Sequence, residues 1–99
     1  MAHRVAPRAE ADLDDIWVYV AKESGSMDVA SRLVDSITRR FFLLSSFPRA
    51  GRARVAHFGA GIRSFPVGEY VILYCIEGAD VQILRVVHGR RGLEGLVEL

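Results

Sequence analysis

Cysteine and lysine are almost missing from this chain of 99 residues, and each absence narrows what the protein can be. Cys75 is the only cysteine, which excludes an internal disulfide and any zinc site that needs several thiolates. A lone thiol suits a reducing compartment, and the opening stretch MAHRVAPRAEADLDD has no apolar core like that of a signal peptide. No apolar run approaches the ~20 residues that cross a bilayer. We therefore expect a cytoplasmic protein that makes no contact with a membrane.

Several fingerprints of chemistry are also missing. The sequence contains no phosphate-binding loop, no dinucleotide-binding glycine pattern and no GxSxG turn. His3 and His57 stand apart from paired carboxylates at ligand spacing, so we expect neither a metal ion nor another cofactor. Asp12, Asp14 and Asp15 do cluster, but acidic residues at the start of a helix are typical of a solvated surface, which is our interpretation.

The overall composition is that of an ordinary globular domain, with 51% apolar and 25% charged residues. A chain of this length supports one hydrophobic core, so we expect a single domain over residues 1–99, with residues 92–99 as a short C-terminal tail. The net charge of +1 does not indicate a nucleic-acid-binding protein. Lys22 is the only lysine among 13 basic residues. Arginine suits bidentate contact with phosphate or carboxylate, although a GC-rich genome would explain the same bias.

The first half of the sequence predicts two amphipathic helices. Pro7 suits the first turn of a helix, and Ser24-Gly25-Ser26 ends that helix and supplies Ser26 as the N-cap of the next. The second helix ends at Phe47-Pro48, and the short connection makes the pair an antiparallel hairpin. The apolar stripes at helical spacing are Ala9, Leu13, Ile16, Trp17 and Val20 in the first helix and Ala30, Leu33, Val34, Ile37, Phe41 and Leu44 in the second.

Beyond a glycine- and arginine-rich loop, the hydrophobic period changes to two. Residues 62–65, 70–76 and 81–88 are strand-like, and their short connections predict an antiparallel meander. Residues 3–6 form a brief first strand or an extended lead-in, and the stretch YVILYCI is typical of a central strand. We therefore predict an α+β fold in which an N-terminal helical hairpin packs on a small, mainly antiparallel β-sheet, with the other sheet face partly open.

The last strand ends in a cationic stretch, LRVVHGRR, at residues 84–91. Strict alternation places Ile83, Arg85 and Val87 on one face and Leu84, Val86 and His88 on the other. Antiparallel pairing could bring arginines of separate strands together over one face, where they would bind phosphate or stabilise negative charge. The predicted cluster consists of Arg63, Arg85, His88, Arg90 and Arg91.

An alternative interpretation leaves these arginines as solvated strand ends or as partners of nearby acids. His88 is the one member whose ordinary pKa of about 6.5 suits general acid–base chemistry, and neighbouring guanidinium groups would bias it toward a base. A histidine at a strand end is also commonly a structural hydrogen-bonding residue.

The order of the motifs resembles the ParE branch of the RelE/ParE superfamily of type II toxins. The stretches that carry the resemblance are PRAEADLDDIWVYVA, FPRAGR, GIRSFPVGEYVILYCI and VQILRVVHGRR, from about Pro7 to Arg91. The resemblance implies an α+β toxin with roles in stress response or plasmid and chromosome stability. It also implies a ParD-like antitoxin, whose C-terminal segment wraps the toxin in a hetero-oligomeric complex.

Two targets are known in the superfamily, because ParE-like members poison DNA gyrase whereas RelE-like members cut mRNA on the ribosome. RelE-like enzymes use cations on the sheet and a tyrosine near the C-terminus. Arg63 and Arg85 match the cation positions, but the tail after Arg91 holds no tyrosine, histidine or lysine, which leaves only His88. The sequence therefore favours a gyrase poison without chemistry of its own, with the arginine cluster as target-binding surface. The alternatives are an endonuclease that uses Arg63, Arg85 and His88, or a non-toxic co-repressor that binds the antitoxin.

A small chain also leaves apolar surface beside its helical hairpin, where an amphipathic partner segment would bury it. Tyr70 and Tyr74 share a strand face with Ile72 and could fill the core or roof a groove. The predicted antitoxin contacts are Leu13, Trp17, Val20, Tyr70 and Tyr74.

Overall fold

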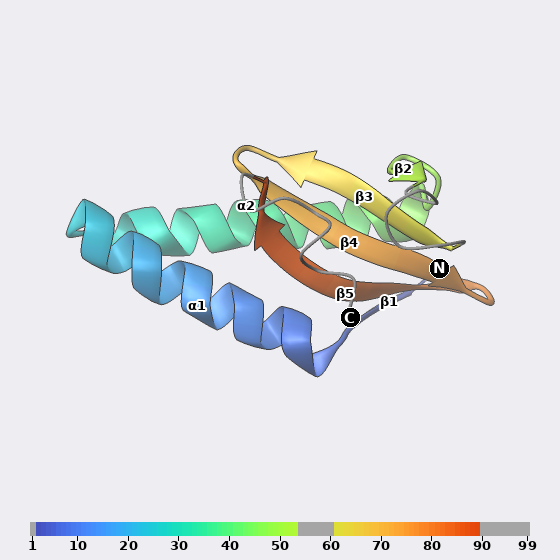
Figure 1. Ribbon diagram of the computed structural model, residues 1–99, viewed down its shortest axis with the longest axis horizontal. Coiled ribbons are helices and arrows are strands. Elements are labelled where there is room, and N and C mark those ends of the chain that lie inside the picture. The colour runs from blue at the N-terminus through green and yellow to red at the C-terminus, as the bar shows by residue number, and fades with distance from the viewer. Residues whose placement is uncertain (1, 54–60, 90–99) are drawn as a thin grey trace.

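The computed structural model of the protein describes residues 2–53 and 61–89 (Figure 1). The predicted tail at 92–99, together with His57, Arg90 and Arg91, lies outside these residues. Two helices and a five-stranded sheet confirm the predicted α+β class. The elements are β1 (His3–Val5), α1 (Pro7–Ser24), α2 (Met27–Ser46), β2 (Arg52–Ala53), β3 (Ile62–Val67), β4 (Tyr70–Glu77) and β5 (Asp80–His88).

The helical hairpin forms as its boundary residues predict. Pro7 begins α1, and Gly25, with a φ of 68°, gives the left-handed turn that ends it. The hydroxyl of Ser26 accepts a hydrogen bond from the amide of Val29 at 3.2 Å and so caps α2. In the part of the chain that the structure describes, no helix is long and apolar enough to span a membrane.

The sheet has two strands more than the predicted meander, and its order is β1-β5-β4-β3-β2. β2 adds a short antiparallel edge beside β3, whereas β1 pairs in parallel with β5 at the other edge. The pairing with β1 covers only Val81 to Ile83 of β5, because the chain turns into α1 at Pro7. The second half of β5 therefore has no strand neighbour on that side among the described residues.

The main core lies between the helical hairpin and one face of the sheet. Figure 1 shows α2 behind the strands and α1 running beside β5. Ile37 and Phe41 of α2 pack with Ile72 and Tyr74 of β4 in this core. Leu73 and Val87 are buried as well, although the strand register turns them away from the core face. The second face is therefore covered at these two positions, whereas Val71 and Cys75 on the same face are only partly buried.

A bulge in β5 changes which of its residues share a face. Tyr74 pairs with Ile83, but the preceding residue of β4, Leu73, pairs with Arg85, so that Leu84 is an extra residue. Ile83 consequently lies on the core face with Val86, instead of opposite to it. The prediction of strict alternation along this strand is wrong, because one inserted residue inverts the alternation beyond it.

Candidate functional site

Arg85, the charged residue in the apolar last strand, is held by Asp12 of α1. The Arg85 guanidinium donates two hydrogen bonds to the Asp12 carboxylate, from Nε at 2.8 Å and from Nη2 at 3.0 Å. The two side chains are only 11% and 14% exposed. The hydrogen bond from Arg85 to Asp12 raises the pKa of the guanidinium, against the opposing effect of burial. The cation is thus neutralised within the chain.

Asp12 also completes the edge of β5 beyond the end of β1. Its Oδ2 accepts a third hydrogen bond, from the backbone amide of Val86 at 2.9 Å. The Asp12 carboxylate therefore accepts the hydrogen bond from the Val86 amide that the carbonyl of a neighbouring strand would otherwise accept. The interpretation of Asp12 as part of a solvated acidic surface is wrong, whereas Asp14 and Asp15 are exposed as expected.

Arg63 is engaged at the opposite side of β4, where it holds the turn between α2 and β2. Its guanidinium donates to the carbonyl of Gly51 from Nε at 3.1 Å and from Nη2 at 2.6 Å, and to the carbonyl of Arg49 at 3.2 Å. The hydroxyl of Tyr74 donates to the carbonyl of Pro48 at 2.7 Å and accepts from the amide of Gly51 at 2.8 Å. Two side chains of the sheet therefore fix this turn.

The predicted convergence of the arginines on one patch is wrong for Arg63 and Arg85. They lie on β3 and β5, with β4 between them, and bind separate segments of the chain. The physical reason is that a guanidinium with little exposure to solvent needs several hydrogen-bond acceptors from the protein. Each of these two arginines finds its acceptors in the segment that lies nearest to it. Arg90 and Arg91 lie outside the described residues, so their part of the prediction stays a prediction.

His88 lies in a groove of about 520 Å³ between α1 and the end of β5, which we call the α1–β5 groove. The ring of His88 meets that of Tyr70 edge-on, with the centroids 5.3 Å apart. Burial, and secondarily Glu69 and Tyr19, raises the pKa of Tyr70 above 10.0. The residues that line the groove are Asp12, Asp15, Ile16, Tyr19, Tyr70, Arg85, Val86, Val87 and His88. The guanidinium that lines it, on Arg85, is already paired with Asp12, and the other described residues that line the groove beside His88 are aromatic, aliphatic or acidic.

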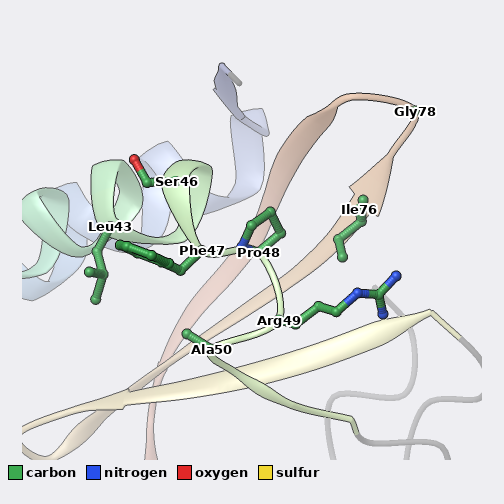
Figure 2. Close-up of a pocket in the computed structure, with 8 residues that line it drawn as sticks. All are labelled: Leu43, Ser46, Phe47, Pro48, Arg49, Ala50, Ile76 and Gly78. Carbon is green, nitrogen blue, oxygen red and sulfur yellow. The ribbon is translucent and has the colours of Figure 1, made fainter.

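A second groove, of about 790 Å³, lies at the C-terminal end of α2 and is called the α2-end groove here (Figure 2). Its lining residues are Leu43, Ser46, Phe47, Pro48, Arg49, Ala50, Ile76 and Gly78. Figure 2 shows the apolar side chains of the helix end and Ile76 of β4 on either side of the 47–50 turn. Phe47 is 63% exposed, and Phe42 on the neighbouring surface is 66% exposed. These are large apolar groups that the fold leaves uncovered.

The predicted antitoxin contacts differ in how much surface they present. Tyr74 is completely buried and its hydroxyl is engaged at both ends, so the prediction of Tyr74 as a contact surface is wrong. Leu13 and Val20 are half-buried against the core, and the indole of Trp17 donates to the Ser31 hydroxyl at 3.1 Å. Tyr70 is buried but lines the α1–β5 groove. The antitoxin contacts of Leu13, Trp17, Val20 and Tyr70 stay a prediction.

Sequence reasoning missed the buried partner of Arg85 and the exposed apolar residues near the end of α2. A charge within an apolar strand requires a buried partner, and this rule could have pointed to one of the aspartates of α1 as the partner of Arg85. The run FFLL in α2 is wider than one helical stripe, which indicates that Phe42 and Leu43 face away from the core. The α2-end groove itself needs a residue of β4 beside the helix end, and no sequence pattern indicates that pairing.

The family model for the ParE toxin of type II toxin–antitoxin systems, parDE, matches residues 4–93 of the chain. Toxin ParE3 of Caulobacter vibrioides is 40% identical over 82 residues, which are 83% of this chain and 80% of that protein. Toxin ParE1 of the same organism is 31% identical over 86 residues, covering 87% of this chain and 86% of that protein.

Two solved structures share the fold. The chromosomal ParDE toxin–antitoxin system from P. aeruginosa contains a chain with a TM-score of 0.78 and 23% identity, covering 89% of this chain and 95% of that one. The toxin–antitoxin complex RelBE2 from Mycobacterium tuberculosis contains one with a TM-score of 0.67 and 27% identity, covering 88% of this chain and 95% of that one. Both similarities extend over nearly the whole chain.

Proposed function

The chain belongs to the ParE toxin family of type II toxin–antitoxin systems, and we propose that it poisons DNA gyrase by binding and is neutralised by a ParD-like antitoxin. Cytoplasmic gyrase would be its target, and the antitoxin complex its resting state. The proposal is of a protein inhibitor with no chemistry of its own. Membership of the family supports an antitoxin as partner. The intramolecular hydrogen bonds of Arg63 and Arg85 support inhibition by binding over RNA cleavage.

The observation that carries the preference for binding is that both candidate catalytic cations have intramolecular partners. RNA cleavage through the 2′-hydroxyl needs a free cation at the phosphate and a proton acceptor beside it. The guanidinium of Arg85 is hydrogen-bonded to the Asp12 carboxylate, and that of Arg63 is hydrogen-bonded to the carbonyls of Gly51 and Arg49. His88, the remaining titratable candidate, faces Tyr70. Binding to a protein target needs none of these groups to be free.

The target-binding surface that we propose is correspondingly smaller than the predicted cluster. His88 is the last residue of β5, and Arg90 and Arg91 come shortly after it in the sequence; all three are assigned to target contact. Arg63 and Arg85 then act indirectly, since Arg63 holds the turn before β2 and Arg85 ties the end of β5 to α1. All five residues therefore remain important for activity, three through direct contact with the target and two through the structure that they hold in place.

The alternative activity is ribosome-dependent mRNA cleavage, and one observation favours it. The similarity to a chain of RelBE2 is greater in sequence, at 27% identity, than the similarity to the ParDE structure, at 23%. The identity to curated ParE toxins is higher than either, at 40% and 31%, which is why the gyrase target is preferred.

Induction of the chain in cells without antitoxin separates the activities. We expect DNA breaks covalently linked to gyrase, intact translated mRNA, and rescue by co-expression of the product of the adjacent reading frame. Cleaved mRNA without breaks would overturn the gyrase proposal in favour of the endonuclease. Growth without either effect, in cells that contain folded protein, would contradict toxicity altogether and leave a non-toxic partner of the antitoxin.

A further inference from the structure

The α2-end groove presents an apolar surface at the C-terminal end of α2. Leu43 and Phe47 project from the end of α2, and Ile76 of β4 forms the facing wall (Figure 2). Pro48 lies between them and its carbonyl is fixed by Tyr74, so the floor of the groove is held in place. A preformed apolar groove of this kind suits an apolar side chain presented by a partner segment.

Unpaired guanidinium groups stand beside this apolar surface. Arg49 lines the groove, and Arg39 lies on the same face of α2 as Leu43, one turn earlier. Neither side chain is in an ion pair within the described part of the chain. The nearest acidic residue in sequence to the groove wall is Glu77, which follows Ile76. The described rim is therefore cationic on balance, and it complements carboxylates.

Among the described residues, the lining of the α1–β5 groove has the opposite charge. Its cation, Arg85, is neutralised by Asp12, and Asp15 adds an exposed carboxylate. An acidic segment would be repelled there and attracted at the α2-end groove, because like charges at an interface are unfavourable. The two grooves thus select partners of different charge.

We propose that the α2-end groove is the docking site of an antitoxin segment that carries an apolar anchor flanked by carboxylates. The anchor packs between Phe47 and Ile76, and the carboxylates meet Arg49 and Arg39. This inference rests on the proposed function, because it takes the antitoxin as the partner. It places the contact at the end of α2, away from Leu13, Trp17 and Val20 of α1, and it leaves the end of β5 to the target.

The test measures the affinity of the full chain for the product of the adjacent reading frame by titration calorimetry. Leu43→Gln with Phe47→Gln removes the apolar walls, and Arg49→Glu reverses the rim charge. Met27→Gln, which is 67% exposed at the other end of α2, is the matched apolar control, and Arg32→Glu is the charge control. We expect each groove variant to weaken binding at least about tenfold and each control to change it less than about twofold. The Arg49→Glu effect should shrink between about 50 and about 500 mM salt.

The outcomes separate this inference from the proposed function. If the unaltered chain binds its partner and the groove variants bind equally well, the docking site is wrong and the toxin–antitoxin pairing stands. Loss of binding with Tyr19→Gln instead would move the contact to the α1–β5 groove and overturn the inference too. If the unaltered folded chain does not bind that partner at all, both the pairing and the groove are wrong. Circular dichroism of each variant confirms that it is folded.

Discussion

Asp12 and Arg85 are 73 positions apart in sequence and form a hydrogen-bonded ion pair that fastens α1 to β5. The pair lies where β1 ends and where the bulge begins, which is the least supported part of the sheet. By also binding the amide of Val86, Asp12 fixes the course of β5 toward His88. A contact that looks structural thus positions His88, one residue of the proposed target surface.

Replacement of Asp12 by alanine should destabilise the fold by about 3 kcal/mol, because it strands a buried guanidinium and a backbone amide. Asp12→Asn should cost less, since its amide oxygen still accepts a hydrogen bond. Urea denaturation measures both free energies of unfolding. Asp14→Ala, at an exposed position of the same helix, is the control and should change stability by less than about 0.5 kcal/mol. Equal stability of the Asp12 and Asp14 variants would show that the ion pair contributes nothing.

Gly51→Ala should destabilise the protein by about 1–3 kcal/mol through overpacking. A Cβ atom at this position would overlap the Tyr74 ring and hydroxyl and lie 2.8 Å from the Ser64 carbonyl oxygen, a backbone atom that cannot move aside cheaply. Tyr74→Phe should cost about 1–2 kcal/mol, since the Pro48 carbonyl and the Gly51 amide lose their partner. Thermal unfolding followed by circular dichroism measures both changes. A Gly51→Ala variant as stable as the parent would mean that the 48–51 turn is not fixed against the sheet.

The stability of the protein should fall at alkaline pH because the pKa of Tyr70 is raised, chiefly by burial and then by Glu69 and Tyr19. The unfolded chain ionises this phenol near pH 10.0, whereas the fold keeps its proton to higher pH. The contribution is therefore complete below pH 10.0 and is lost as the pH rises from there through the folded pKa. Urea midpoints measured between about pH 8 and about pH 11 should show this slope, and Tyr70→Phe should flatten it.

Cys75 has to be removed from that comparison. Burial, and then Glu77, raises the pKa of its thiol above 9.0. Ionisation of the thiol therefore also lowers the stability of the fold as the pH rises, beginning near pH 9.0 and so below the range of Tyr70. The pair of proteins to compare is therefore Cys75→Ala with and without Tyr70→Phe. An unchanged alkaline slope in the double variant would contradict the shift at Tyr70.

Arg90→Ala together with Arg91→Ala should lower toxicity at least about tenfold while antitoxin affinity stays within about twofold. The reason is that these residues are assigned to the proposed target surface, whereas the antitoxin is assigned to the α2-end groove. Colony counts after induction measure toxicity, and Arg32→Ala, on the exposed side of α2, is the control. Full toxicity of the double variant in cells would remove the two arginines from the target surface.

The sequence by itself determined the two helices and the three strands of the meander, because their boundaries depend on neighbouring residues. Pro7, Gly25 and Ser26 define the helical hairpin through local backbone geometry and capping, and the motifs identified the toxin family. Periodicity also gave the core stripes of both helices, since burial of one helix face needs only a repeat of apolar residues.

Only the tertiary structure decided which charges are free. The bulge at Leu84 inverted the faces of β5, the parallel pairing of β1 left half of β5 without a neighbour, and Asp12 filled that place. Whether an arginine binds a partner protein or its own chain depends on acceptors brought close by folding, over 73 residues for Arg85. Such contacts leave no periodic trace in the sequence, because they are set by the distance between elements and not by the order of residues within one.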